Sequence, residues 1–221
     1  TNVSWYQEQG FLPQAILNFI GQLGWTHPEG KEIFSLDEFI QLFKLEDVSP
    51  AGPVFDETKL RWMNGKYIRE ILTDDELFTE IKKYVTLPIA EDQIKKVIPL
   101  IKERIEVLSQ VNDLLKFLLP EQSVDLELVK KQSKKTSKEI EQLLTDLKTD
   151  LEKLEKWETA EIEKVIRDLK GKYENWGGRD YFMTIRVATT AFSVTPPLFD
   201  SIEVLGKELV LKRINIAIES L

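Results

Sequence analysis

Residues 53–70 read Pro-Val-Phe-Asp-Glu-Thr-Lys-Leu-Arg-Trp-Met-Asn-Gly-Lys-Tyr-Ile-Arg-Glu and are the most informative stretch of this 221-residue chain. Their Asn64-Gly65 pair is typical of a turn. The residues on both sides nevertheless keep the three- and four-residue spacing of a helix. The two signals conflict at this point, so the fold class has to be decided by the segments around it.

The segments nearest to this stretch carry the signals of short helices. Pro13 suits the first turn of a helix. Ser35 and Glu38 have the spacing of a capping box, and Thr73 and Glu76 repeat it. The helix that begins at Pro13 would carry four apolar residues on one face: Ile16, Leu17, Ile20 and Leu23.

The helices expected after residue 92 are longer and more regular. Pro99 marks a kink or a new start, Pro120 ends the next segment, and Thr159 can cap a later helix. Gly177-Gly178 breaks the chain before a final helical region. No apolar–polar alternation lasts long enough for a sheet, so we predict an all-α fold. Two apolar stripes support it: Ile101, Ile105, Leu108 and Leu115, and then Ile140, Leu143, Leu144, Leu147, Leu151 and Leu154. The second stripe favours a bundle helix over a short coiled coil.

The distribution of proline and glycine predicts two helical subdomains with a boundary near Thr73. Residues 1–72 contain short helices joined by loops such as 26–30 and 49–53. In residues 73–221 glycine is almost absent until Gly171. We therefore divide the chain into 1–72 and 73–221, and the second part into 73–170 and 171–221.

The composition limits the function. The formal net charge of −8 argues against non-specific binding of nucleic acid. The absence of cysteine excludes disulfides and thiolate metal sites, and it favours an intracellular protein, which we expect to be cytoplasmic. No apolar run reaches the ~20 residues that a membrane-spanning helix needs. The first residue is Thr1 rather than Met, which suggests a fragment or a processed product.

No constellation of residues predicts an active site. The single histidine, His27, stands in a loop without metal-binding partners, and we interpret it as a solvated residue. Gly177-Gly178 lacks the Lys-Ser/Thr pair and the preceding strand of a phosphate-binding loop. The many acidic pairs are typical of solvated helix faces. We therefore expect no catalytic residue, no cofactor-binding residue and no metal ligand in this chain.

Basic residues cluster in three places. Residues 130–138 form the densest run, which we interpret as a solvated helix face, with contact to phosphates as the alternative. Lys102 and Arg104 flank the first long stripe. The third cluster mixes cations and aromatic rings as single-stranded RNA sites do, although such mixtures more often form a core. It comprises Arg179, Arg186, Lys207, Lys212 and Arg213, with Trp176, Tyr181, Phe182, Phe192 and Phe199.

Four segments resemble, in the same order, the bacterial-type glutamyl-tRNA synthetases, which are class I aminoacyl-tRNA synthetases. The Asp-x-x-Lys-Leu-x-Trp-Met-Asn-Gly-x-Tyr-Ile-Arg pattern of residues 56–69 is the most specific, and its helix would run through Asn64-Gly65. The other matches are Trp5-Tyr6 with residues 10–20 and 23–25, residues 33–39, and, near the end, residues 186–188, 198–199 and 205–208.

The resemblance implies the C-terminal half of such a synthetase, beginning after its Lys-Met-Ser-Lys-Arg-type loop. Residues 1–72 would be the remainder of the stem-contact region, and residues 73–221 an elongated helical anticodon-binding bundle. The partner would be tRNA(Glu), bound by a monomer. ATP and Mg would belong to the catalytic domain of the parent glutamate–tRNA ligase, so this chain should be inactive alone.

The resemblance also suggests site residues. Arg104 falls where discriminating members of the family place an arginine that reads the third anticodon base, and an arginine fork suits a base edge. A loop near the end of the chain falls where the family holds the first two bases. Ala191 and Pro197 stand there in place of expected glycines, and Pro196-Pro197 should stiffen the loop. The residues expected at these two bases are Arg186, Thr195, Pro196, Leu198 and Phe199.

Two further cations, Lys66 and Arg69, are expected either to touch the tRNA backbone or to form ion pairs within the chain. Two competing interpretations stay open at this point. One is an acidic helical protein-interaction module without RNA binding, suggested by the net charge and the 140–154 stripe. The other is a free-standing enzyme, which a single histidine and the lack of cysteine and of a phosphate loop make the weakest of the three.

Overall fold

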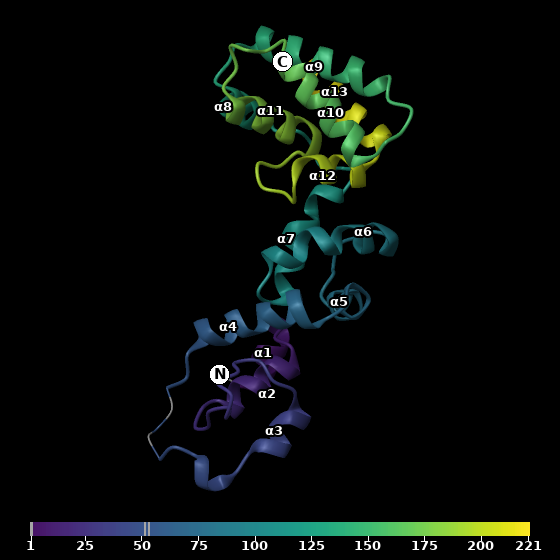
Figure 1. Cartoon of the computed structure of the whole chain (residues 1–221). Coiled ribbons are helices and arrows are strands. Elements are labelled where there is room, and N and C mark those ends of the chain that lie inside the picture. The colour runs from purple at the N-terminus through teal and green to yellow at the C-terminus, as the bar shows by residue number, and fades with distance from the viewer. Residues whose placement is uncertain (1, 51, 53) are drawn as a thin grey trace. The chain divides into compact units, whose positions relative to one another are not determined.

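The computed structural model describes residues 2–50, 52 and 54–221, and these residues contain helices, turns and loops but no strand (Figure 1). The predicted all-α fold is confirmed. The chain forms two compact units. Unit 1 consists of Thr1–Thr86 with Ile101–Asp113, and unit 2 of Leu87–Leu100 with Leu114–Leu221. Within the described residues no helix is long and apolar enough to cross a bilayer.

Unit 1 is built around α4 (Glu57–Lys66), which contains the Asn64-Gly65 pair. Asp56 caps this helix by accepting hydrogen bonds from the amides of Thr58 and Lys59. The helix runs through the pair, as the resemblance implied, and continues into a π-helical turn at Tyr67–Ile71. The helices of this part are α1 (Val3–Gln9), α2 (Pro13–Gly21), α3 (Leu36–Leu42), α4 (Glu57–Lys66) and α5 (Asp74–Ile81), with 3₁₀ turns at Leu45–Asp47, Lys102–Arg104 and Leu108–Gln110.

The buried side chain of Asn64 explains why a turn-forming residue stands inside a helix. Its Oδ1 accepts the Leu12 amide at 2.8 Å, and its Nδ2 donates to the Glu106 carbonyl. The side chain therefore joins α4 to two distant segments instead of bending its own backbone. Buried polar groups need such partners, so this position is fixed by tertiary contacts that spacing along the chain does not reveal.

Unit 2 is a helical bundle. In it α8 (Leu126–Ser133) packs on α11 (Gly178–Thr190), α9 (Ser137–Glu152) on α13 (Lys207–Glu219), α10 (Thr159–Lys170) on α12 (Leu198–Leu205), and α11 on α13. The predicted stripe is confirmed over α9, where its apolar residues have no exposed surface, whereas its last member, Leu154, lies beyond the end of the helix and is half-buried. The fully buried residues are Ile140, Leu143, Leu144, Leu147 and Leu151. The remaining helices, α6 (Glu91–Ile101) and α7 (Val111–Leu115), each have residues in both units.

The first long stripe does not belong to one helix, which corrects the expectation for residues 101–115. The chain leaves α6 at Ile101, makes a 3₁₀ turn and becomes extended at Ile105. Pro99 lacks a backbone donor in the last turn of α6, and the Leu108 amide donates to the Gly10 carbonyl instead of to a helical neighbour. All four residues of the stripe are nevertheless buried.

The predicted helix starts are largely confirmed. Pro13 is the first residue of α2, and Thr73 and Glu76 form a complete capping box. Ser35 accepts from the Glu38 amide, as expected of a cap. Thr159 is the first residue of α10 rather than its cap; the cap position is Glu158, and Thr159 binds the Glu203 carboxylate instead.

The interpretation of His27 as a solvated residue was wrong, because it is 2% exposed. Its ring stacks on Phe34, its Nδ1 accepts the Glu29 amide at 3.0 Å, and its Nε2 lies 3.2 Å from Glu38 Oε1. The apolar face of α2 is only partly covered: Leu17 and Ile20 are about half exposed, and the helix buries Ala15, Asn18 and Phe19.

Candidate nucleic-acid interface

The loop between α11 and α12 is organised by Arg186, one of the predicted site residues. Its Nη1 donates to the Pro196 carbonyl at 2.8 Å and to the hydroxyl of Thr195. The same carbonyl accepts the Ser201 hydroxyl at 3.2 Å. Thr195 is 3% exposed and Pro196 is buried. The structure thus brings Arg186, Thr195 and Pro196 into one cluster in which a charged donor holds the backbone of the loop.

The start of this loop is also tied to α11. The Thr190 hydroxyl donates to the Arg186 carbonyl at 2.7 Å and accepts the Phe192 amide at 3.2 Å. Ala191 ends α11 with φ 67° and ψ 3°, a left-handed conformation. The glycine that the family pattern led us to expect here is therefore replaced by a residue that keeps the glycine-type backbone.

Leu198 and Phe199 follow the loop at the start of α12. Leu198 is 6% exposed, so most of its surface packs within unit 2. The Phe199 ring is half-buried and lies edge-on to Phe182, with 6.3 Å between ring centroids. Val194, at the tip of the loop, is 73% exposed. The loop thus presents apolar side chains beside backbone groups held in place, the combination that an unstacked base needs.

The remaining predicted site residues belong to unit 1. Arg104 is exposed at the end of the 3₁₀ turn Lys102–Arg104. Lys66 pairs with Glu70 at 2.6 Å, one of the two alternatives considered for it. Arg69 is half-buried, and its Nη1 lies 3.5 Å from the Ile105 carbonyl, next to the segment that carries Arg104.

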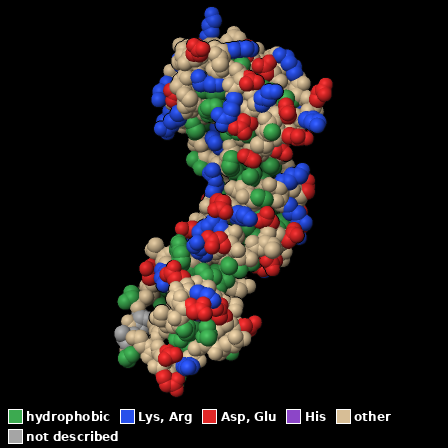
Figure 2. All heavy atoms as spheres, viewed as in Figure 1, with side chains coloured by type: hydrophobic (Ala, Val, Ile, Leu, Met, Phe, Trp, Pro, Cys, Tyr) green, Lys and Arg blue, Asp and Glu red, His purple; other side chains and the backbone are tan. Residues whose placement is uncertain are grey.

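The dense basic run at 130–138 spans the end of α8 and the start of α9. Lys130 lies 3.5 Å from Glu127, Lys134 lies 3.3 Å from Asp180, and Lys135 donates to the Asn175 carbonyl. On the face shown in Figure 2, lysine and arginine side chains are interspersed with acidic ones. These contacts favour a solvated, ion-paired surface for the run.

Arg213 is the one fully buried cation of its sequence cluster. It is 1% exposed and donates to three backbone carbonyls, those of Phe117 at 3.0 Å, Thr189 at 3.2 Å and Leu119 at 2.7 Å. Burial lowers its pKa to about 10. Arginine suits this position because its fork reaches several carbonyls at once. Because Thr189 lies near the end of α11, Arg213 fixes the base of the α11–α12 loop from inside the bundle.

Arg167 is a residue of this region that the sequence did not single out. It lies on α10, where Glu163 accepts from its Nε at 2.6 Å, and its guanidinium carbon stands 5.3 Å from the centroid of Phe199 and 5.7 Å from that of Phe182. The Glu163-Arg167 spacing of four residues was the available signal, but the same spacing recurs in ordinary solvated helix pairs.

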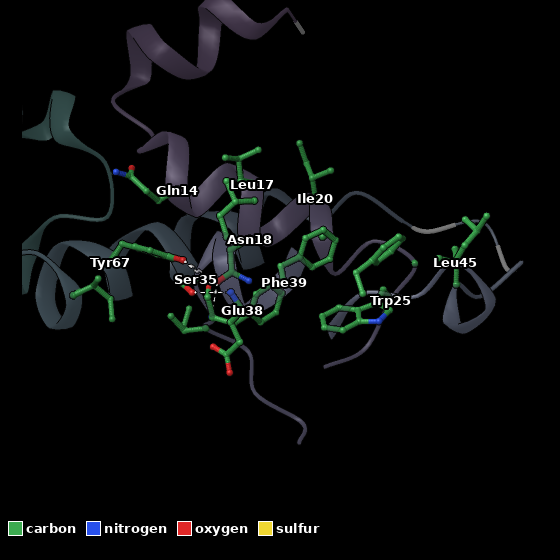
Figure 3. Close-up of a pocket in the computed structure, with 18 residues that line it drawn as sticks. Gln14, Leu17, Asn18, Ile20, Trp25, Ser35, Glu38, Phe39, Leu45 and Tyr67 are labelled. Atoms are coloured by element: carbon green, nitrogen blue, oxygen red, sulfur yellow. Dashed lines mark hydrogen bonds between the residues drawn. The ribbon is translucent and has the colours of Figure 1, made fainter. Parts of the chain in front are cut away.

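Unit 1 contains an apolar cavity of about 860 Å³ between α2, α3 and the Leu45–Asp47 turn (Figure 3). Two buried donors at its wall, Asn18 Nδ2 and Trp25 Nε1, lack an acceptor within the described part of the chain. The Asn18 Oδ1 accepts from Tyr67 and from the Phe34 amide, which fixes the orientation of the amide. No group of acidic or histidine side chains in the described ranges is arranged to hold a metal ion.

Comparison with known proteins agrees with this geometry. Residues 76–218 match the family described as "Anticodon binding domain", and residues 1–62 match "tRNA synthetases class I (E and Q), catalytic domain". The chain therefore belongs to the anticodon-binding domain family of class I aminoacyl-tRNA synthetases.

The relatives are more specific. The chain is 36% identical to the glutamate–tRNA ligase of Deinococcus radiodurans over 97% of its own length and 45% of that protein. It is 35% identical to that of Thermus thermophilus, over 99% of its length and 46% of that protein. A glutamate tRNA ligase crystal structure from Elizabethkingia meningosepticum superposes with a TM-score of 0.85 at 29% identity, covering 98% of this chain and 43% of that chain. The expected resemblance to the C-terminal half of glutamyl-tRNA synthetases is confirmed, and the chain spans somewhat less than half the length of these relatives.

Proposed function

We propose that this chain binds tRNA(Glu) and reads its anticodon. The observation that carries the proposal is the α11–α12 loop, whose backbone is held by Arg186 within the region that matches the anticodon-binding family. Bases of an anticodon loop are unpaired, so they can be recognised by apolar contacts and by fixed backbone groups. The relatives are glutamate–tRNA ligases, which supports glutamate as the amino acid that is attached to the bound tRNA.

Each predicted residue has a role in this proposal. Arg186 shapes the loop by binding Thr195 and Pro196. The half-buried Phe199 supplies most of the apolar surface to the first two anticodon bases, and Leu198, which is 6% exposed, adds only the edge that it leaves at the surface. Arg104, exposed on unit 1, reads the third base through the two donors of its guanidinium. Lys66 and Arg69 approach the tRNA backbone.

The two parts of the chain have different roles in this proposal. We assign residues 1–72 to contact with the tRNA stem and residues 73–221 to the anticodon, which the two family matches at 1–62 and 76–218 support. The parent activity is ATP-dependent glutamylation, and ATP and Mg belong to the catalytic part of the relatives. We expect no glutamylation by this chain alone, a cytoplasmic location and a monomer.

The net charge of −8 is compatible with this function. Phosphate contacts produce most of the salt dependence and the non-specific affinity of RNA binding. Sequence-specific recognition of unstacked bases uses stacking and hydrogen bonds to base edges, which are not phosphate contacts. We therefore expect affinity to depend less on salt than it does for proteins with a basic face.

The decisive experiment is fluorescence anisotropy of the purified chain with three RNAs at one moderate salt concentration. These are tRNA(Glu), the same tRNA with its third anticodon base changed, and an unrelated tRNA. Preference for unaltered tRNA(Glu) is the expected result. Equal binding to all three would reduce the proposal to a generic RNA surface, and no binding with concentration-dependent self-association would favour the protein-interaction module.

Arg104→Ala and Phe199→Ala test the two parts of the site separately. Arg104→Ala should reduce the preference at the third base by about 1–3 kcal/mol and leave the melting temperature unchanged, because Arg104 is exposed. Phe199→Ala should weaken binding of every tRNA(Glu) variant by about 1–3 kcal/mol. Unchanged discrimination in Arg104→Ala would contradict its assignment, and a lower melting temperature without a binding change would show that Phe199 serves only the core.

A further inference from the structure

The exposed guanidinium of Arg167 adjoins the α11–α12 loop. Its side chain is 57% exposed, and it stands over the two half-buried rings of Phe182 and Phe199. Phe199 is the second residue of α12, directly after the loop. Phe182 lies four residues before Arg186 on α11, so the two share one face of that helix. Arg167 therefore contacts one ring from each of the two helices that the loop joins.

The position of the guanidinium is constrained from both sides. Glu163 accepts its Nε hydrogen at 2.6 Å from one turn earlier in α10. The two rings below stand nearly perpendicular to each other, at 83°, and attract the cation through their π faces. Among the described residues, the hydrogen bond to Glu163 engages only the Nε of this guanidinium. The side chain as a whole is 57% exposed, so much of its surface is accessible to a ligand.

We propose that Arg167 is a further nucleotide-contacting residue of this chain, on whose guanidinium an unpaired base of the anticodon loop stacks. The base, the guanidinium and the ring of Phe199 would form three successive layers. A planar, weakly hydrated guanidinium stacks on bases, whereas an ammonium acts as a point charge. The inference rests on the proposed anticodon function, and it adds to it a residue on α10 that no sequence motif identified.

An ordinary solvated ion pair is the competing explanation, and the chain contains a matched control for it. Arg61 pairs with Glu57 at 3.0 Å with the same four-residue spacing, and its guanidinium carbon lies 5.6 Å from the ring of Phe11. Arg61 belongs to unit 1 and has no proposed part in reading the anticodon. It reproduces the ion pair of Arg167 and one of its ring contacts, with a less exposed side chain, 29% against 57%.

The test uses the full chain and an RNA hairpin that contains only the anticodon stem and loop of tRNA(Glu). Its affinity is measured by fluorescence anisotropy over a series of salt concentrations for Arg167→Gln, Arg167→Lys and Arg61→Gln. We expect Arg167→Gln to weaken binding about 5- to 150-fold, which is the range for one lost base stack. Arg167→Lys should recover the salt dependence but only part of the affinity, and Arg61→Gln should bind as the unsubstituted chain does. All three variants should keep the melting temperature.

The outcomes separate the inference from the function on which it rests. If the unsubstituted chain does not bind the hairpin, the proposed anticodon function fails, and this inference fails with it. If the chain binds and Arg167→Gln binds equally well, only the role of Arg167 is refuted. Full recovery by Arg167→Lys, or an equal loss in Arg61→Gln, would reduce Arg167 to a source of positive charge and refute the stacking.

Discussion

Gly10 is the residue whose replacement should damage unit 1 most directly. Its backbone has φ 83°, and a Cβ placed on it would lie 2.6 Å from the Leu108 amide nitrogen and 2.7 Å from the Leu108 Cβ. Gly10→Ala should therefore lower the free energy of unfolding by roughly 2–4 kcal/mol, since it combines a steric clash with an unfavourable backbone conformation. Denaturant unfolding measures this change.

Gly30→Ala is the matched control. Gly30 has φ 71°, but a Cβ there would meet nothing within 4 Å. Gly30→Ala should lower the free energy of unfolding by only about 1 kcal/mol, because alanine is disfavoured in the left-handed backbone conformation. Equal losses for the two variants would show that the approach of Leu108 to Gly10 contributes nothing.

Ala191 offers the opposite change. It occupies the left-handed region at the end of α11, where glycine carries no Cβ penalty. Ala191→Gly should raise the free energy of unfolding by about 0.5–1 kcal/mol, the gain in the folded state being partly offset by the greater entropy of glycine in the unfolded chain. Lys134→Gly, at φ 53° after α8, should behave alike. A lower melting temperature in Ala191→Gly would show that packing of the Ala191 methyl group stabilises the fold by more than the left-handed backbone of this residue destabilises it.

Individual residues were the least predictable part of the site. His27 was interpreted as a solvated loop residue, and Arg213 was placed in a cluster of cations and aromatic rings; both are buried and hydrogen-bonded within the fold. Two of the three carbonyls that Arg213 binds lie 94 and 96 positions away along the chain, so no local pattern could reveal them. The position of Arg186 was expected from the family motif. Its use of two loop residues as partners was not, because that depends on the path of the α11–α12 loop.

At the scale of elements, the capping boxes of α5 and α9 predict a dependence of stability on pH. The amide and hydroxyl of Thr73 hold the pKa of Glu76 below its ordinary value of 4.5, and those of Thr136 do the same for Glu139. A carboxyl whose pKa is lower in the folded chain stabilises it above the unfolded pKa and loses that contribution as the pH falls through the folded one. Stability should thus decline as the pH drops below about 4.5.

The double variant Glu76→Gln and Glu139→Gln tests this prediction. Glutamine keeps the capping geometry but does not titrate. Melting temperatures measured between about pH 3 and 7 should therefore fall less steeply in the variant than in the unsubstituted chain. Parallel curves would mean that other carboxyls dominate the acid transition.

Secondary structure was predicted correctly where a single helix carries a buried apolar stripe, and wrongly where several segments contribute to one stripe. The 140–151 stripe of α9 is one uninterrupted buried face, as its spacing indicated. The 101–115 stripe is equally buried, but hydrogen bonds to Gly10 and Asn64 replace those of a helix there. The spacing of apolar residues predicted burial correctly in both segments, but it predicted the secondary structure correctly only in α9.

At the scale of the whole molecule, exposed apolar surface is unevenly distributed. Of the large hydrophobic side chains that are exposed among the described residues, all but Val194 and Ile216 belong to unit 1. Several of them line the cavity of Figure 3, including Leu17 and Ile20. Large apolar patches of this kind mark binding surfaces or sites of association.

A dye that fluoresces on apolar surfaces should therefore bind the native chain in the cavity. Ile20→Gln should reduce this fluorescence clearly while changing the free energy of unfolding by less than about 0.5 kcal/mol, because Ile20 is 54% exposed. Ile216→Gln, in unit 2, is the control and should leave dye binding unchanged. Equal fluorescence in the two variants would place the dye elsewhere.

The burial of His27 provides a spectroscopic consequence. It is the only imidazole of the chain, and it is enclosed in unit 1 by the rings of Trp25 and Phe34. Its ring protons should give one isolated pair of NMR resonances, displaced by the ring currents of its neighbours. Because unit 2 contains no such group, the intensity of these resonances during denaturation follows unit 1 alone, without any label added to the protein.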